Sequence, residues 1–125
     1  MKHIIAIAAG GALGAVLRFW SAQAVQTAVA KHFPFGTLFV NVSGSLLMGV
    51  LYVVLVERGL LNDEWRAFLT IGMLGAFTTF STFSIETVSL LTAGEWFKAM
   101  TNMILSVVLC VGAAWCGLVL ARQFS

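Results

Sequence analysis

The stretch Gly75–Ser84, GAFTTFSTFS, lies inside a long apolar part of the sequence, yet half of its ten residues carry a hydroxyl group. Gly72 and Gly75 come just before β-branched threonines, and both residue types weaken an α-helix. Backbone that leaves helical geometry is tolerated at membrane depth only inside protein or beside a cavity. Hydroxyl groups can then bond the backbone groups that lose their helical partners. The stretch therefore predicts a helix that is broken within the membrane, near residues 77–79.

The whole sequence has the composition of an integral membrane protein. Of its 125 residues, 60% are hydrophobic and 10% are charged, whereas roughly a quarter are charged in a soluble domain. About 20 apolar residues cross the hydrocarbon core of a bilayer, and four runs in this chain reach that length. They cover residues 4–30, 35–56, 67–93 and 99–121. We expect a single all-α domain over residues 1–125, with four transmembrane helices and a break in the third.

The positive charges are almost balanced between the two sides of this arrangement. The side with both termini and the second connection carries Lys2, Arg58, Arg66 and Arg122; the other side carries Lys31 and Lys98, with Arg18 inside a span. Positive residues normally mark the cytoplasmic side. Two readings stay open: a cytoplasmic N-terminus with weak bias, or insertion in both orientations followed by antiparallel pairing.

Catalytic and nucleic-acid-binding motifs are missing from the sequence. Cys110 and Cys116 are best read as small packing residues. No histidine, cysteine or acidic cluster has metal-ligand spacing, and no glycine-rich loop opens a nucleotide-binding unit. The excess of two positive charges is too small to suggest nucleic acid. We therefore expect neither an enzyme nor a nucleic-acid-binding protein.

Polar and small residues recur along the spans at helical spacing. Two stripes lie four residues apart and so share a helix face: Thr37, Asn41 and Ser45, and Asn102, Ser106 and Cys110. Small and weakly polar residues usually mark packed helix interfaces in membranes. The GxxxG pair Gly10 and Gly14 predicts such an interface on the first span. Asn41 differs, because a carboxamide at mid-membrane has two donors and an acceptor to satisfy.

Four further side chains suggest an ion path. Arg18 and Glu86 are charged residues inside spans, where a charge is costly unless it faces protein or water. Their structural alternatives are an ion pair or an aqueous vestibule for Arg18 and a helix-end position for Glu86. Phe80 and Phe83 are three apart and would project from the same side of a helix. Aromatic edges carry positive potential, so edge-on rings can solvate a small anion; lipid-facing filler is the alternative.

These residues carry a resemblance that covers essentially the full chain. GGALGAVLR at 10–18, GTLFVNVSGS at 36–45 and GAFTTFSTFS at 75–84 resemble the Fluc (CrcB) family of bacterial fluoride channels. The resemblance implies an antiparallel, dual-topology homodimer in the bacterial inner membrane. Such a dimer has two pores that export fluoride and select strongly against chloride. It also implies a structural sodium ion at the dimer centre.

The resemblance assigns roles to individual residues. Phe80 and Phe83 correspond to pore phenylalanines and Asn41 to the pore amide, and Glu86 lies near the pore mouth. Gly75 and Thr78 match residues whose backbone carbonyls bind the sodium ion. The remaining expected members of the fluoride pathway are Arg18, Thr37, Ser81, Thr82, Ser84 and Ser106. One departure is Asn102, where family members can carry tyrosine, so an aromatic role at that mouth is in doubt.

Two other functions fit a four-span chain of this length. A small multidrug-resistance antiporter exports cationic drugs in exchange for protons, but it depends on an acidic residue in the first span, and residues 4–30 contain none. A non-transporting assembly subunit held by small-residue packing would leave Asn41, Arg18 and the hydroxyl run unexplained. Fluoride flux, drug–proton exchange and the absence of transport distinguish the three.

Overall fold

The computed structural model describes residues 1–29 and 32–124, and within them every regular element is helical. The first span is α1 (Lys2–Ala28), and the second is α2 (Phe35–Leu51) continued by the π-helical segment η1 (Tyr52–Glu57). The third comprises α3 (Asp63–Arg66), π-helical η2 (Ala67–Leu74), α4 (Gly75–Phe77) and α5 (Phe80–Thr92), and the fourth is α6 (Trp96–Gln123). All four are long and apolar enough to cross a membrane.

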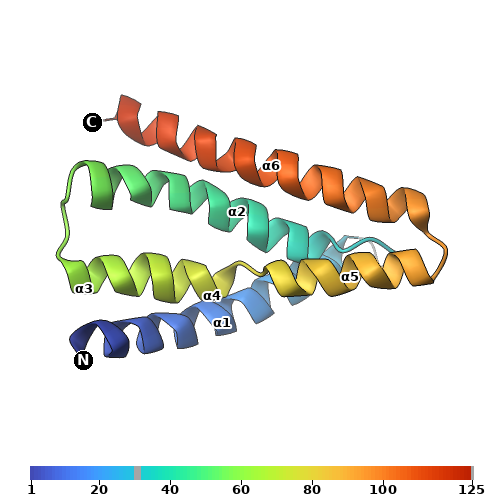
Figure 1. The fold of residues 1–125 in the computed structure, drawn as a ribbon, viewed down its shortest axis with the longest axis horizontal. Coiled ribbons are helices and arrows are strands. Elements are labelled where there is room, and N and C mark those ends of the chain that lie inside the picture. Colours follow the sequence, from blue (N-terminus) through green and yellow to red (C-terminus); the bar gives the residue numbers. More distant parts are fainter. Residues whose placement is uncertain (30–31, 125) are drawn as a thin grey trace.

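Successive spans run in opposite directions (Figure 1). Both termini and the connection from η1 to α3 lie at one end of the bundle, whereas the connection from α5 to α6 lies at the other. The first end carries Lys2, Arg58, Arg66 and Arg122, and Lys98 belongs to the second. Lys31, together with Ala30 at the expected end of the first span, lies outside the described residues. Each described positive residue outside the spans therefore lies at the end of the bundle that the sequence predicted for it.

The expected break in the third span is confirmed. Helix α4 ends at Phe77, and the next two residues are extended, with φ/ψ of −87°/155° at Thr78 and −150°/114° at Thr79. Helix α5 then begins at Phe80, displaced from the axis of the first half (Figure 1). A helix that stops leaves the carbonyls of its last turn without helical N–H partners, so the two extended residues create polar backbone at mid-span.

Helix ends differ from the ends of the apolar runs. The third helix begins at Asp63 rather than at residue 67, because the Asn62 side chain accepts a bond of 3.0 Å from the Trp65 N–H and caps it. Helix α6 runs from Trp96 to Gln123, beyond the expected 99–121 at both ends. Hydropathy marks where the lipid begins, whereas caps decide where a helix begins.

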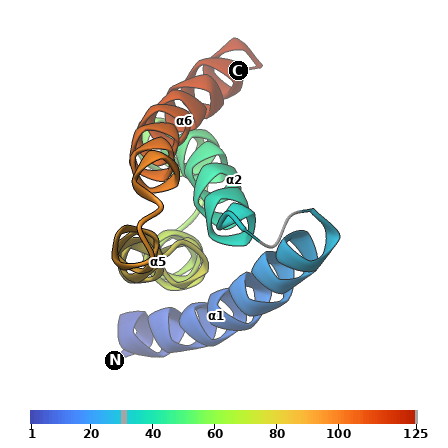
Figure 2. The same cartoon turned by 90° about the vertical axis from the view of Figure 1, so that its right-hand side faces the viewer.

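Glycine allows the spans to touch backbone to backbone. Gly10 and Gly14 are buried where α1 packs on η2, and a Cβ at either would overlap a main-chain oxygen, that of Phe68 or Met73. Gly49 and Gly117 have the same function between α2 and α6. Viewed along the bundle, α1 crosses the third span obliquely while α6 leans on α2 (Figure 2). The interface expected from the GxxxG pair is confirmed.

Large apolar side chains point outward on every span. Ile71 is 61% exposed and Trp115 is 69% exposed, whereas the buried core is limited to a few side chains such as Val40, Leu55 and Leu74. A protein in water would hide such residues, and here lipid is the solvent that suits them. The chain is therefore a multi-pass membrane protein.

Candidate functional site

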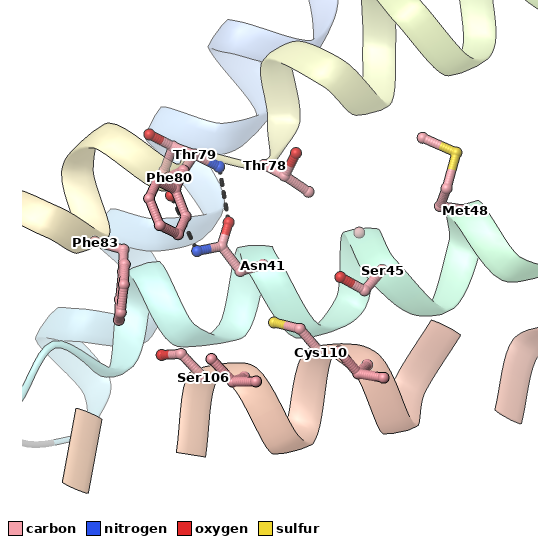
Figure 3. A pocket seen from close by; sticks show the side chains of 12 residues that line it. Asn41, Ser45, Met48, Thr78, Thr79, Phe80, Phe83, Ser106 and Cys110 are labelled. Carbon is pink, nitrogen blue, oxygen red and sulfur yellow. Dashed lines mark hydrogen bonds between the residues drawn. The ribbon is translucent and has the colours of Figure 1, made fainter. Parts of the chain in front are cut away.

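Asn41 joins the second span to the break in the third. Its Nδ2 donates to the Thr79 carbonyl at 3.1 Å, and its Oδ1 accepts from the Thr79 N–H at 2.7 Å. Figure 3 shows both bonds as dashed lines. The carboxamide thus satisfies donor and acceptor of one residue that has left the helix. One Nδ2 hydrogen is left over, since the amide carries two.

Two other side chains support the break. The Arg18 Nε donates to the Ala76 carbonyl at 3.0 Å, across 58 residues of sequence. The Thr79 hydroxyl caps α5: it accepts from the Thr82 N–H at 3.2 Å and donates to the Thr82 hydroxyl at 3.0 Å. Arg18 therefore bonds a main-chain carbonyl at the level of the break.

A cavity of about 390 Å³ opens on one side of the Asn41–Thr79 contact. We call it the phenylalanine cavity. Its lining residues are Asn41, Gly44, Ser45, Met48, Thr78, Thr79, Phe80, Phe83, Ser106, Val107, Cys110 and Val111. Figure 3 shows the two phenylalanine rings at one end and Met48 toward the other, with Ser106 and Cys110 along α6. The walls are mostly apolar, and the few polar groups come from α2, α6 and the break.

A second cavity, of about 470 Å³, lies on the other side of the contact. We call it the arginine cavity. Its lining residues are Arg18, Phe19, Ala22, Gln23, Gln26, Thr27, Gly36, Thr37, Val40, Thr79, Thr82 and Glu86. Thr79 lines both cavities. We call its pair of hydrogen bonds with Asn41 the clamp, and the clamp lies between the arginine cavity and the phenylalanine cavity. One Glu86 oxygen, Oε1, is buried and has no hydrogen-bond partner among the described residues.

The two phenylalanines are neighbours with very different exposure. Their ring centroids are 5.4 Å apart at an interplanar angle of 45°. Phe83 is 9% exposed, but Phe80 is 77% exposed. The sequence expectation that both project from one side agrees with this contact. Phe83 belongs to the wall of the chain itself, whereas Phe80 offers most of its ring to whatever lies outside.

The expected pathway residues divide among three places. Asn41, Phe80, Phe83 and Ser106 line the phenylalanine cavity, and Arg18, Thr37, Thr82 and Glu86 line the arginine cavity. Ser81 and Ser84 line neither of these two cavities. Ser84 donates to the Phe80 carbonyl at 2.9 Å, and the exposed Ser81 hydroxyl lies 3.5 Å from that of Thr79. These two hydroxyls are bonded within the chain's own turns.

The expected cation ligands lie at the break. Gly75 is the first residue of the short helix α4, and Thr78 is the first extended residue after that helix. The Thr78 hydroxyl donates to the Leu74 carbonyl at 3.0 Å, so any cation there would meet main-chain carbonyls. Within the described residues, no group of three or more histidine, cysteine or acidic side chains is placed to hold a metal.

Sequence reasoning placed the break near residues 77–79 but missed the partner of Asn41. Nothing in the sequence signalled that this amide would bond the main chain of Thr79. Asn102, which the resemblance places near a pore mouth, is 2% exposed in this chain, and its Nδ2 donates to the Thr87 hydroxyl at 2.9 Å. Its spacing with Ser106 did place both on one helix face, and Ser106 donates to its Oδ1 at 3.4 Å.

The fold and the break define a class: a four-span membrane protein whose third helix is interrupted beside two cavities, each with a few polar groups in a largely apolar wall. A family model described as "CrcB-like protein, Camphor Resistance (CrcB)" matches residues 5–118. The chain belongs to this CrcB family, which comprises ion channels and not enzymes.

Curated relatives are similar over nearly the whole chain. The fluoride-specific ion channel FluC of Methylococcus capsulatus is 52% identical over 122 residues, which are 98% of this chain and 54% of that protein. The chain thus spans about half the length of that relative. Proteins of the same name from Coxiella burnetii and Geobacter sulfurreducens are 45% and 47% identical, with 98% and 99% of their lengths covered.

Proposed function

We propose that this protein is a fluoride-selective channel that lets fluoride leave the cytoplasm. The observation that carries the proposal is the phenylalanine cavity, in which an amide, hydroxyls and two aromatic rings meet beside the broken helix. Relatives that bear the name fluoride-specific ion channel and match most of the chain support it. We also propose that the protein lies in the plasma (inner) membrane of a bacterium.

The chemistry of the cavity suits a small, strongly hydrated anion. Such an ion must exchange its water shell for donors along the route, because an unpaired charge in a low-dielectric site is very costly. The free Nδ2 hydrogen of Asn41, the Ser106 hydroxyl and the edges of Phe80 and Phe83 are available donors or positive surfaces. Arg18 in the arginine cavity supplies a positive charge on the approach.

We propose further that the working unit is an antiparallel homodimer with two pores. Phe80 is 77% exposed although it lines the cavity, so a second copy would complete the wall that one chain leaves open. The near balance of positive charge between the two ends favours insertion in both orientations. Chains inserted in opposite orientations would then be present in the same membrane and could pair antiparallel.

A structural sodium ion at the dimer centre is the last part of the proposal. The ligands would be the carbonyls of Gly75 and Thr78, which lie where helical N–H partners run out. Backbone carbonyls suit a hard monovalent cation, and the Arg18 bond to Ala76 leaves these two carbonyls unused by that side chain. The residues therefore fit such an ion, which would hold the two breaks together.

Reconstitution into liposomes under an anion gradient tests the function. Fluoride efflux well above that of protein-free liposomes, with chloride retained, is the expected result. Proton-coupled drug exchange would instead identify an antiporter, and no transport of any kind would leave an assembly subunit. The antiporter is disfavoured because residues 4–30 contain no acidic side chain.

Fixing the orientation tests the dimer. Several lysines added to the connection between η1 and α3 should hold that end of the bundle in the cytoplasm. We expect a variant of this kind to be inactive alone and active when it is co-expressed with one biased the opposite way. Full conduction by a single forced orientation would contradict the antiparallel arrangement.

Replacing sodium tests the cation. Liposomes prepared in N-methylglucamine salts should lose fluoride flux or dimer stability, and sodium should restore both. Unchanged flux and unchanged dimer stability in sodium-free medium would reduce the break to a helix kink without a bound ion.

A further inference from the structure

Many hydroxyl groups on the spans are taken up by their own helices. They donate to the carbonyl four residues earlier at 2.7 to 3.0 Å, and such bonds occur at Ser43, Thr70, Thr78, Ser84, Thr87 and Thr101. This bond is the usual choice for serine and threonine in a membrane helix. A hydroxyl proton held in this way is not available to an ion.

Ser106 is one of the described hydroxyls that do not bond the carbonyl four residues earlier. It donates to the side-chain Oδ1 of Asn102 rather than to the carbonyl of that residue, and the distance is 3.4 Å. This bond is at the weak limit for O–H···O geometry. Ser106 also lines the phenylalanine cavity, so its proton is both loosely held and next to the proposed ion path.

The Phe83 carbonyl fixes the donor and the acceptor of each hydrogen bond in the chain that leads to Asn102. The Phe83 carbonyl can only accept, so the Thr87 hydroxyl donates to it, at 2.8 Å. A hydroxyl has a single proton, and Thr87 must therefore accept from the Asn102 Nδ2, at 2.9 Å. The Asn102 amide is thereby oriented with Oδ1 toward Ser106. Asn102 is 2% exposed and Thr87 is 6% exposed, so water does not compete for these groups.

We propose that Asn102 is a positioning residue that keeps the Ser106 hydroxyl off its own helix backbone, ready to turn into the phenylalanine cavity and donate to an anion. The proposal rests on the fluoride-channel function proposed above. When an anion arrives, only the 3.4 Å bond is given up. The two shorter bonds through Thr87 stay in place, so the amide keeps its orientation and receives the proton again when the anion leaves.

A double-mutant cycle tests this role. Asn102→Leu keeps a similar volume and removes the Oδ1 acceptor, so Ser106 should fall back on the carbonyl of residue 102. We expect maximal fluoride flux to fall by about tenfold, the rate factor that corresponds to one hydrogen bond. In a Ser106→Ala background the same substitution should cause no further loss, because there is no hydroxyl left to position.

Two variants separate this effect from loosened packing. Ser106→Thr keeps a hydroxyl and should restore the sensitivity to Asn102→Leu. Thr101→Val is the matched control, since Thr101 is next to Asn102 and bonds the Phe97 carbonyl; it should leave flux unchanged. If Asn102→Leu does not assemble, Asn102→Ala takes its place in the cycle. Thermal stability of each purified variant is measured beside its flux.

The outcomes distinguish the inference from the function on which it rests. If Asn102→Leu lowers flux equally with Ser106 present and in the Ser106→Ala background, the positioning role is overturned while the channel remains. Loss of flux that follows thermal stability across the series has the same consequence. Absence of fluoride flux in the unsubstituted protein overturns the channel and the inference together. Loss only where residue 106 has a hydroxyl supports both.

Discussion

The first half of the third span, residues 63–77, touches α1 mainly through its main chain, and we call it the packed half. The second half, residues 78–92, is attached to its neighbours by side-chain hydrogen bonds, and we call it the polar half. At Gly10, Gly14 and Gly72 a Cβ would meet main-chain atoms of the other helix. Around α5 the contacts are those of Asn41 with Thr79 and of Asn102 with Thr87. Shape fixes the packed half, apart from the Arg18 bond to Ala76 at its end, whereas the polar half is fixed by polar groups that an ion can also use. This fold therefore separates its rigid packing from its exchangeable hydrogen bonds.

Gly14→Ala should break the packed half and gives the largest expected effect. The added methyl would overlap the Met73 carbonyl, which can move only if two helices separate. Overpacking typically costs about 1 to 3 kcal/mol, and because this contact is with rigid main chain we expect the upper end of that range and a large loss of the folded fraction in detergent. Gly11→Ala is the matched control, because its Cβ would come no closer than 4.0 Å to the Gly72 carbonyl oxygen. A stable Gly14→Ala protein would contradict the close contact.

The sequence could predict the packed half better than the polar half. Four apolar runs, the small residues at GxxxG spacing and the break all follow from local composition and periodicity. The bonds of Arg18 to Ala76 and of Asn41 to Thr79 join residues 58 and 38 apart in the chain, and no periodic pattern encodes them. The resemblance likewise assigned Ser84 to the fluoride pathway, and the structure shows only that its hydroxyl donates to the Phe80 carbonyl one turn earlier.

Asn41→Leu should break the polar half while leaving the glycine contacts intact. It leaves the N–H and carbonyl of Thr79 without these partners, at a cost of about 2 kcal/mol. We expect lower thermal stability and no measurable fluoride flux. Asn41→Asp is informative beside it, since a carboxylate can still accept from the Thr79 N–H but cannot donate to the carbonyl. If Asn41→Leu kept both stability and flux, the clamp would be dispensable.

Phe80→Ile and Phe83→Ile compare a ring that is exposed on the surface of the chain with a ring that is buried within it. Isoleucine keeps the site apolar and removes the aromatic quadrupole, worth about 1 kcal/mol. We expect either substitution to lower fluoride flux by about tenfold. Only Phe83→Ile should also lower monomer stability, because Phe83 is buried and Phe80 is 77% exposed.

Methionine provides the control for the two rings. Its polarizable thioether and flexible chain adapt to an irregular site, so Phe80→Met and Phe83→Met should reduce flux less than the isoleucine variants do. The double Phe80→Ile, Phe83→Ile protein is the decisive case. If it is well folded and carries fluoride at the unsubstituted rate, the rings have no part in conduction.

Thr79→Ala gives the smallest expected effect, because it removes one cap from the polar half and leaves the clamp in place. The clamp uses the main chain of Thr79, which alanine retains. The lost group is the hydroxyl that accepts from the Thr82 N–H at 3.2 Å, and a helix cap of this kind is worth about 0.5 to 1 kcal/mol. Thr79→Ser keeps the hydroxyl and should behave like the unsubstituted protein in thermal unfolding. If alanine instead costs as much stability as Asn41→Leu, then the side chain and not the main chain of Thr79 holds the break, and the division between the two halves of the third span would have to be redrawn.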